Sequence, residues 1–299
     1  MKDFDIRLQK NECIAGETVR GDLVLSIKKN GFKARKFKFY VFGEEKTKII
    51  VDIGIPKTYQ ESNVFFYKDL SHFPSSVEKV VWPDSTMEVP QGDWLIPFEF
   101  IIPKYAYESY NGRNVSIIYE IRLMAEREWK EDINEKVSFT VINPNVLLPE
   151  TDMMVHLSEV RIRRKEGGYL IVKLDLEGGS NFHSGETIKG RISLEGGGEY
   201  LQEKTDKAKE VRDAEIVLQS IEYSRTKETE KTITVNTYKQ KVEMNIEENS
   251  SDALFEFQIP QTVKRSYKGM YSTYYWVLGI RFDIAQVHNV DLRTTIQII

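Results

Sequence analysis

The sequence of 299 residues predicts an all-β protein built from two tandem, antiparallel, immunoglobulin-like β-sandwich domains. Apolar and polar residues alternate with the period of two that β-strands show, and the 3.6-residue period of helices is scarce. The stretch AGETVRGDLVL at 15–25 returns as SGETIKGRISL at 184–194, an offset of 169 residues (184 − 15). Solenoid repeats are only roughly 20 to 50 residues long, so this spacing indicates two related domains.

The repeated stretch has the character of a structural turn that leads into a strand. Gly16 and Gly185 can adopt the positive φ of a tight turn at no steric cost. Gly21 and Gly190 then interrupt the strand, as glycines do at bulges or where another backbone comes close. Because the motif recurs in the same strand position, it identifies the fold and is not expected to be a binding site.

The first half predicts a series of strands. Strand-like segments cover 3–9, 17–27, 36–42, 49–55, 63–67, 77–82 (a strand or an edge segment), 92–103, 115–129 and 136–142. KKNG at 28–31 is a turn of the Asn-Gly kind, so the second strand is expected to pair with the third as an antiparallel neighbour. The third strand is expected to end in GEEKTK at 43–48. Pro97 is expected near its strand start, where a missing N–H is tolerated.

The second half restarts the same order of features. Strands are expected at 155–165, 169–178, 184–194, 214–225, 254–260 and 274–285, and LFEFQIP at 254–260 matches PFEFIIP at 97–103. Between the halves, INPNVLLPE at 142–150 carries two prolines and no alternation, which places the domains at 1–146 and 147–299. The insertion at 199–213 lacks a strand pattern, and both a short surface helix and a mobile loop stay open for it.

Composition excludes several classes of protein. The net charge of −4, from 42 basic and 46 acidic residues, argues against a general nucleic-acid binder. Nowhere do 18 apolar residues run together, so no spanning helix is expected. The single cysteine, Cys13, allows no intrachain disulfide and favours a cytoplasmic location. We expect Cys13 to be a small buried apolar side chain and not a nucleophile.

Motifs for catalysis and for cofactors are missing from the sequence. The four histidines are scattered without the clustering that a zinc site needs. There is no G-x-S-x-G nucleophile elbow and no glycine-rich phosphate loop. Glu44 and Glu45 are adjacent in a strand, so their carboxylates point to opposite faces and cannot share one reacting bond. We therefore expect no cofactor, no metal and no enzymatic activity.

Four features in order resemble the arrestin-like superfamily. These are AGETVRGDLVL, then FYVFGEEKT, then PFEFIIP, and then SYNGRNVSIIYEIRLMAEREW at 109–129. The superfamily takes in visual and β-arrestins, α-arrestins, the arrestin-like subunit of the retromer coat and a bacterial sporulation-control protein. SYNGRNVSIIY at 109–119 looks most like the retromer subunit. The second half repeats the motifs more weakly, so the resemblance covers the whole chain.

The resemblance implies two arrestin-type β-sandwiches set side by side, without catalytic chemistry. It also implies an adaptor or scaffold that binds protein partners, namely cargo, receptors or coat components, in intracellular trafficking or signalling. The alternative is a self-associating structural or regulatory arrestin-fold protein that binds no cargo. The oligomeric state is left open by the sequence.

Two basic stretches are candidates for contact with an anionic surface. The candidate residues are Lys33, Arg35, Lys36, Lys38, Arg161 and Arg163. Lys36 and Lys38 share one face of a strand, as do Arg161 and Arg163. The plain interpretation is a solvated strand face that discourages edge pairing. The functional interpretation is contact with anionic lipid headgroups, which would make the protein peripheral to membranes, or with phosphorylated partners.

A tyrosine-rich loop in each half precedes the long strand. The second loop, KRSYKGMYSTYYW, supplies the candidate partner contacts Arg265, Tyr267, Lys268, Tyr271 and Tyr274. Tyrosine gives rigid apolar area with a polar end, which suits interface anchors. The alternative is that these tyrosines pack their own loop onto the end of the sandwich.

Overall fold

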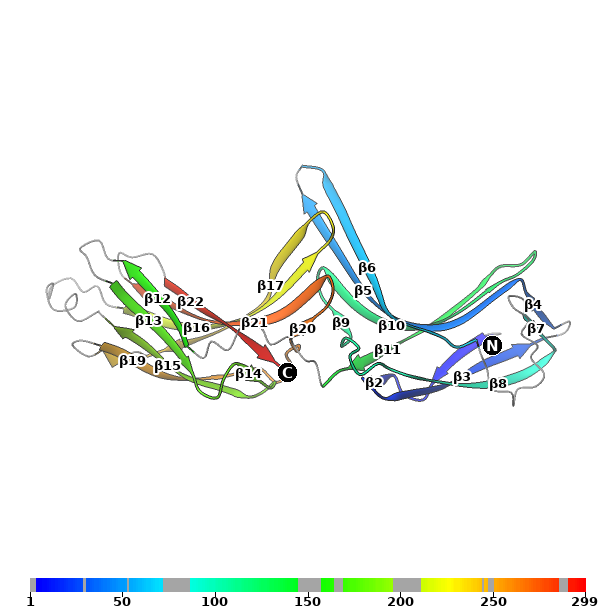
Figure 1. Cartoon of the computed structure of the whole chain (residues 1–299), viewed down its shortest axis with the longest axis horizontal. Coiled ribbons are helices and arrows are strands. Elements are labelled where there is room, and N and C mark those ends of the chain that lie inside the picture. The colour runs from blue at the N-terminus through cyan, green and yellow to red at the C-terminus, as the bar shows by residue number, and fades with distance from the viewer. Residues whose placement is uncertain are drawn as a thin grey trace. The chain divides into compact units, whose positions relative to one another are not determined.

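The computed structural model describes ten stretches of the chain, and within them it is built from strands without helices (Figure 1). The described residues are 4–28, 31–52, 54–71, 87–144, 157–163, 169–195, 211–243, 245–246, 250–284 and 290–299. The chain forms two compact units. Unit 1 comprises Met1–Val146, Ser224–Glu230 and Gly269–Ser272, and unit 2 comprises Leu147–Tyr223, Lys231–Lys268 and Thr273–Ile299. In the described stretches no helix has the length and apolar character needed to span a membrane.

In the residues that the structure describes, the first half of the chain forms a β-sandwich with eleven strands. They are β1 (Phe4–Leu8), β2 (Glu12–Ile14), β3 (Thr18–Ile27), β4 (Phe32–Ala34), β5 (Lys36–Asp52), β6 (Pro56–Asp69), β7 (Met87–Val89), β8 (Gly92–Ile101), β9 (Tyr110–Asn111), β10 (Val115–Glu126) and β11 (Ile133–Ile142). One sheet has the order β1-β3-β8, and the other has the order β2-β11-β10-β5-β6 with β9 beside β10. Strands β4 and β7 form a small separate ladder.

The second β-sandwich repeats this plan. Its strands are β12 (Leu157–Arg163), β13 (Tyr169–Leu176), β14 (Asn181–Phe182), β15 (Thr187–Glu195), β16 (Val211–Arg225), β17 (Glu230–Val242), β18 (Asn245–Ile246), β19 (Ser250–Gln258), β20 (Tyr267–Lys268), β21 (Ser272–Ile284) and β22 (Val290–Ile298). The sheets are β12-β13-β15-β19-β18 and β14-β22-β21-β16-β17. Strand β14 pairs in parallel with β22 just as β2 does with β11. The structure therefore contains two tandem β-sandwiches, as the sequence predicts.

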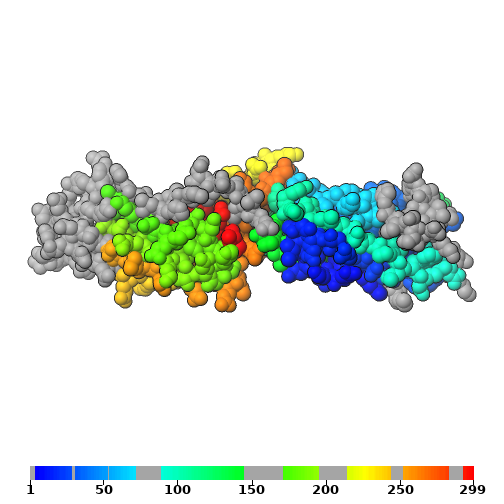
Figure 2. All heavy atoms as spheres, turned by 60° about the horizontal axis from the view of Figure 1, so that its bottom comes forward, coloured from blue at the N-terminus to red at the C-terminus, as the bar shows by residue number. Residues whose placement is uncertain are grey.

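The core of unit 1 lies between its two sheets. Phe39 of β5 meets Phe98 of β8 with ring centroids 5.2 Å apart, and Phe100 of β8 meets Phe139 of β11 at 5.9 Å. Each large apolar side chain buried in this way contributes roughly 1.5–3 kcal/mol. Figure 2 shows the outer side of the three-stranded sheet, where β1 and β3 (blue) lie beside β8 (turquoise).

The two copies of the repeated turn match in their backbone and hydrogen bonds. Gly16 and Gly185 have φ values of +91° and +81°, which confirms the predicted left-handed turn. The carboxylate of Glu17 accepts a hydrogen bond from the backbone N–H three residues earlier at 3.0 Å, and Glu186 does the same at 2.6 Å. The Gly-Glu pair that the two halves share therefore builds the same turn, which the glutamate carboxylate closes.

The second glycine of each copy lies where another backbone comes close. A Cβ at Gly21 would collide with the Arg7 carbonyl oxygen and lie 2.6 Å from a phenylalanine ring of the next strand. A Cβ at Gly190 would collide with the Asp175 carbonyl oxygen and lie 2.8 Å from the equivalent ring. Close packing between strands thus explains both glycines.

Three expectations about the strands of the first half were wrong. Strand β3 pairs with β1 and β8, whereas β5 lies in the opposite sheet, because the chain crosses the sandwich after 28–31. Strand β5 does not end at 43–48 but continues to Asp52 as one arm of a long hairpin with β6. Pro97 lies in the middle of β8 and is tolerated because β8 is an edge strand. The segment 77–82 and most of the insertion at 199–213 lie outside the described residues.

Unit 1 buries the Cys13 thiol and the Glu45 carboxylate. Cys13 is a free thiol with 2% exposure, as predicted, and burial raises its pKa. The fully buried Glu45 carboxylate accepts hydrogen bonds from the N–H groups of Met270 and Tyr271, at 2.9 and 3.1 Å, and from the Ser272 hydroxyl at 2.5 Å, all within unit 1. Glu44 is on the opposite face of β5, as the alternation predicts.

We expect Gly190→Ala to destabilise the protein by about 1–3 kcal/mol, because the new Cβ would push two strands apart. Gly279→Ala in β21 is the matched control, since its Cβ would meet the nearest atom at an ordinary 3.4 Å. The measurement is the urea midpoint of unfolding. Equal midpoints for the two variants would show that the close approach at Gly190 does not constrain the fold.

Candidate functional site

The outer face of β5 carries an unusual apolar cluster. Phe39, Tyr40, Val41 and Phe42 are four consecutive apolar residues, so β5 has apolar side chains on both faces. Phe39 and Val41 are fully buried between the sheets. Tyr40 and Phe42 therefore lie on the face of the sheet that points away from the core.

The pairing of β5 with its neighbours positions a row of side chains beside this cluster. Opposite Phe42 are Glu120 on β10 and Tyr67 on β6. Opposite Tyr40 on β10 is Arg122. Directly opposed residues on one face of a sheet are close enough for their side chains to interact. Three strands thus supply one continuous outer surface.

A β-bulge in β6 decides which of its side chains face outward. Gly43 pairs with Phe66 and Glu44 with Val64, so Phe65 is an extra residue on β6. Phe65 packs inward, with ring centroids 4.7 Å from Tyr107 and 5.6 Å from Tyr119.

Phe66 also contacts the core, at 6.3 Å from Phe100. Because Phe65 and Phe66 both point inward, Val64 and Tyr67 both point outward, with 53% and 56% exposure.

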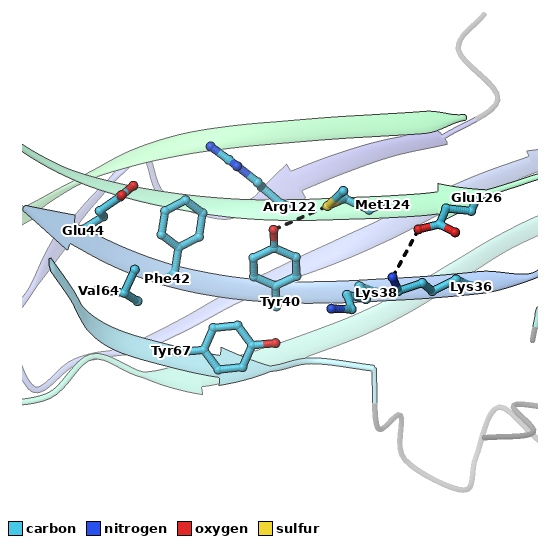
Figure 3. A pocket seen from close by; sticks show the side chains of 10 residues that line it. All are labelled: Lys36, Lys38, Tyr40, Phe42, Glu44, Val64, Tyr67, Arg122, Met124 and Glu126. Atoms are coloured by element: carbon cyan, nitrogen blue, oxygen red, sulfur yellow. Dashed lines mark hydrogen bonds and ion pairs between the residues drawn. The ribbon is translucent and has the colours of Figure 1, made fainter. Parts of the chain in front are cut away.

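The outward-facing aromatic rings form a connected cluster (Figure 3). The Tyr40 ring lies 5.5 Å from Tyr67 and 5.9 Å from Phe42, in tilted arrangements. The Tyr40 hydroxyl donates to the Met124 sulfur at 3.5 Å. Met124 is 38% exposed. These contacts hold the rings in place while leaving Tyr67, Val64 and Met124 open to solvent.

Arg122 covers the other side of the cluster. Its guanidinium carbon lies 4.7 Å above the Phe42 ring, which is why Phe42 is only 5% exposed although it is on the outer face. Two guanidinium nitrogens donate to Glu120, at 2.6 and 2.8 Å. Burial lowers the pKa of Arg122, but the hydrogen bond to Glu120, the charge of Glu120 and the contact with Tyr40 together outweigh it and leave the pKa raised. Arg122 therefore stays charged, and its side chain forms one side of the site.

Side chains of β5, β6 and β10 enclose a shallow pocket of about 400 Å³, which we call the outer-face pocket. It is lined by Lys36, Lys38, Tyr40, Phe42, Glu44, Val64, Tyr67, Arg122, Met124 and Glu126. Lys36 pairs with Glu126 at 3.2 Å, and Glu44 pairs with Lys46 at 2.9 Å. Among the described residues Lys38 has no ion-pair partner. The pocket can therefore hold an apolar group with a negative charge beside it.

The structure brings together only part of the predicted basic set. Lys36 and Lys38 line the outer-face pocket. Lys33 and Arg35 are exposed but outside its lining. Arg161 and Arg163 belong to β12 of the second sandwich, and their side chains lie outside what the structure describes.

The tyrosine-loop expectation needs a correction for two residues. Tyr267 and Tyr274 are 3% and 0% exposed, and their rings stack with centroids 6.4 Å apart. They are not available as partner contacts; they pack the loop onto the sandwich end. Tyr271 and Arg265 are half-buried and Lys268 is exposed, so these three stay candidates for a surface contact.

The same packing recurs in both halves at an offset of 157 residues. Ser109 exchanges hydrogen bonds with Val141, at 2.8 and 2.9 Å, and Ser266 does so with Ile298, at 2.7 and 3.1 Å. The Tyr119 hydroxyl donates to the Tyr107 carbonyl, as the Trp276 indole N–H donates to the Lys264 carbonyl. The recurrence of Ser-Tyr-x-Gly at 109–112 and 266–269 would have indicated this structural role.

Sequence reasoning missed the centre of the outer-face pocket. Tyr40, Phe42, Tyr67, Arg122 and Met124 were assigned only to strands. The available signal was the break in alternation at 39–42, because four consecutive apolar residues in a strand give both faces an apolar surface. The bulge that turns Tyr67 outward left no comparable signal.

A comparison with known protein families finds a match in the first half of the chain. Residues 3–147 match the family model described as Arrestin (or S-antigen), N-terminal domain. These residues hold all three strands that line the outer-face pocket. No curated protein matches the chain.

We expect Arg122→Ala to lower stability by about 1–3 kcal/mol, because it uncovers Phe42 and removes the main partner of the nearly buried Glu120 carboxylate. Lys136→Ala is the control. Lys136 also pairs with Glu120, but at 3.8 Å and with 62% exposure, so its loss should cost about 0–1 kcal/mol. Thermal unfolding of both variants tests this. An unchanged midpoint for Arg122→Ala would show that its contacts with Phe42 and Glu120 do not stabilise the protein.

Proposed function

Because the chain belongs to the arrestin-like superfamily, we propose that it is a non-enzymatic adaptor that binds protein partners in intracellular trafficking or signalling. Membership supports the general kind of function, an adaptor or scaffold, since arrestin-type sandwiches work through surfaces and not through catalytic groups. The partner classes in this proposal are cargo, receptors and coat components. Function must then be found on a surface of the fold.

The observation that carries the proposal is the outer-face pocket. A sheet face that points away from the core needs no aromatic residues for folding, yet this one holds Tyr40, Phe42 and Tyr67 beside Met124 and Arg122. Tyrosine, methionine and arginine are enriched at protein–protein interfaces, and tyrosine and arginine dominate binding hot spots. The cluster lies on paired strands, so its side chains are held in place before a partner arrives.

The proposal places the contact in the cytoplasm, which the single buried thiol of Cys13 favours. Peripheral contact with an anionic membrane is a secondary part of the proposal. It rests on the exposed side chains of Lys33 and Arg35. In the sequence these residues shortly precede Lys36 and Lys38, the basic residues of the outer-face pocket. Raising the salt concentration should weaken such a contact.

We expect Tyr67→Ala to reduce capture of partners from the native cell about tenfold or more, with the melting temperature nearly unchanged. Leu95→Ala is the matched control, because Leu95 is a similarly exposed apolar residue, at 63%, on the other sheet of unit 1. Tagged wild type and both variants are compared by quantitative mass spectrometry.

Identical partner sets for the three proteins would contradict a role for the outer-face pocket. If the wild type captures no partner and light scattering shows a mass that grows with concentration, the chain is a self-associating structural protein instead of an adaptor.

A further inference from the structure

We propose that the free edge of β6 binds an extended segment of a partner protein by strand addition. The segment would carry an aromatic or branched apolar residue, which packs on Val64 and Tyr67, and an acidic residue on the same face, which pairs with Lys38. This inference rests on the proposed adaptor function and names how the partner is held.

The main chain of β6 offers unpaired hydrogen-bonding groups. Strand β6 is the last in its sheet, and no strand in the described ranges pairs with its other side. The N–H of Leu70 donates to the Phe39 carbonyl of β5 at 2.8 Å. Because successive N–H groups along a strand point to opposite sides, those of Asp69 and Tyr67 point away from β5, toward the free edge. An added strand can bond there.

The middle of strand β6 lacks the prolines and lysines that often protect an edge. Between 58 and 67 it holds no proline and a single charged residue, Glu61, while Lys57 and Lys68 flank this stretch. Natural edge strands are commonly short or blocked by lysine and proline. At 14 residues, β6 is long. Its open, β-prone middle therefore favours a strand-pairing role.

A second pocket lies along the same edge, on the opposite face of β6. It has a volume of about 800 Å³ and is lined by Lys68, Asp69 and Leu70 of the β6 end together with residues of β3 and β8, Phe98 among them. Side chains of an added strand alternate between the two faces. Its residues would reach the outer-face pocket and this second pocket in turn, so the main chain supplies affinity and the two pockets supply specificity.

Charge selects the partner segment. In the outer-face pocket, Arg122, Lys36 and Glu44 each have an ion-pair partner, whereas Lys38 has none among the described residues. Lys38 lies on β5 beyond Tyr40, toward the Asp69 end of the neighbouring strand. An acidic residue two or four positions from the apolar residue of the partner would approach this ammonium on the same face.

The experiment starts from a display library of random segments of about ten residues, the length of a long strand, selected on the full chain. The most enriched peptide is synthesised with a fluorescein label and used as the probe. We expect enriched peptides to carry an apolar residue and an acidic residue at the predicted spacing. Binding should protect the amides of Tyr67 and Asp69 from hydrogen exchange, a readout that needs no variant.

Two substitutions of Asp69 separate the effect of its edge N–H from that of its carboxylate. Asp69→Pro removes an N–H that faces the free edge, and edge strands tolerate proline. Asp69→Ala removes the same carboxylate, which accepts the Ser71 N–H, but keeps the edge N–H. Fluorescence anisotropy should show about tenfold weaker probe binding for Asp69→Pro than for Asp69→Ala, because both variants lose the carboxylate and only the proline variant loses the edge N–H.

The strand-addition proposal is overturned if no peptide is enriched, if both variants bind the probe equally, or if protection appears away from β6. It is also overturned if the wild type dimerises and Asp69→Pro separates the dimer, since a second copy would then occupy the edge. Should Asp69→Pro still capture the cellular partners that Tyr67→Ala loses, strand addition fails while the adaptor function stands.

Discussion

Gly43 lies where β5, β6 and β10 meet, and the arrangement of the whole outer face follows from its missing side chain. A Cβ at this position would stand 2.7 Å from the Phe65 ring and 2.8 Å from the Tyr119 ring, closer than packed atoms allow. Without it, Phe65 packs against Tyr119, and the extra residue of the bulge is absorbed on the core side of β6. The outer side of β6 is then free to present Val64 and Tyr67.

Core and surface are linked through this one position. The inner rings close the end of the sandwich, while the shifted register aligns Tyr67 with Phe42 and places it beside Tyr40. Arg122 is held by Glu120 on the same strand, β10, and its guanidinium covers the Phe42 ring of β5. A surface fixed by paired strands loses little conformational entropy on binding, which suits an adaptor that must recognise a partner without catalysing a reaction.

Sequence reasoning recovered what depends on local pattern. The turns at Gly16 and Gly185 were predictable because a glycine-rich turn and the strand after it are adjacent in the chain, and their recurrence revealed two domains. The bulge was not predictable from the sequence, because it depends on how residues 43–44 of β5 pair with residues 64–66 of β6. The prediction that Tyr267 contacts a partner was wrong, because a tyrosine that anchors an interface and one that packs a loop have the same local sequence pattern.

Nuclear Overhauser contacts between aromatic rings in the full chain measure whether the bulge turns Phe65 inward and Tyr67 outward. We expect contacts of Phe65 with Tyr119 and of Tyr67 with Tyr40, because these pairs of ring centroids lie 5.6 and 5.5 Å apart. Contacts of Tyr67 with Tyr119, together with a solvent-exposed Phe65, would contradict this arrangement, since β6 would then present the opposite set of side chains.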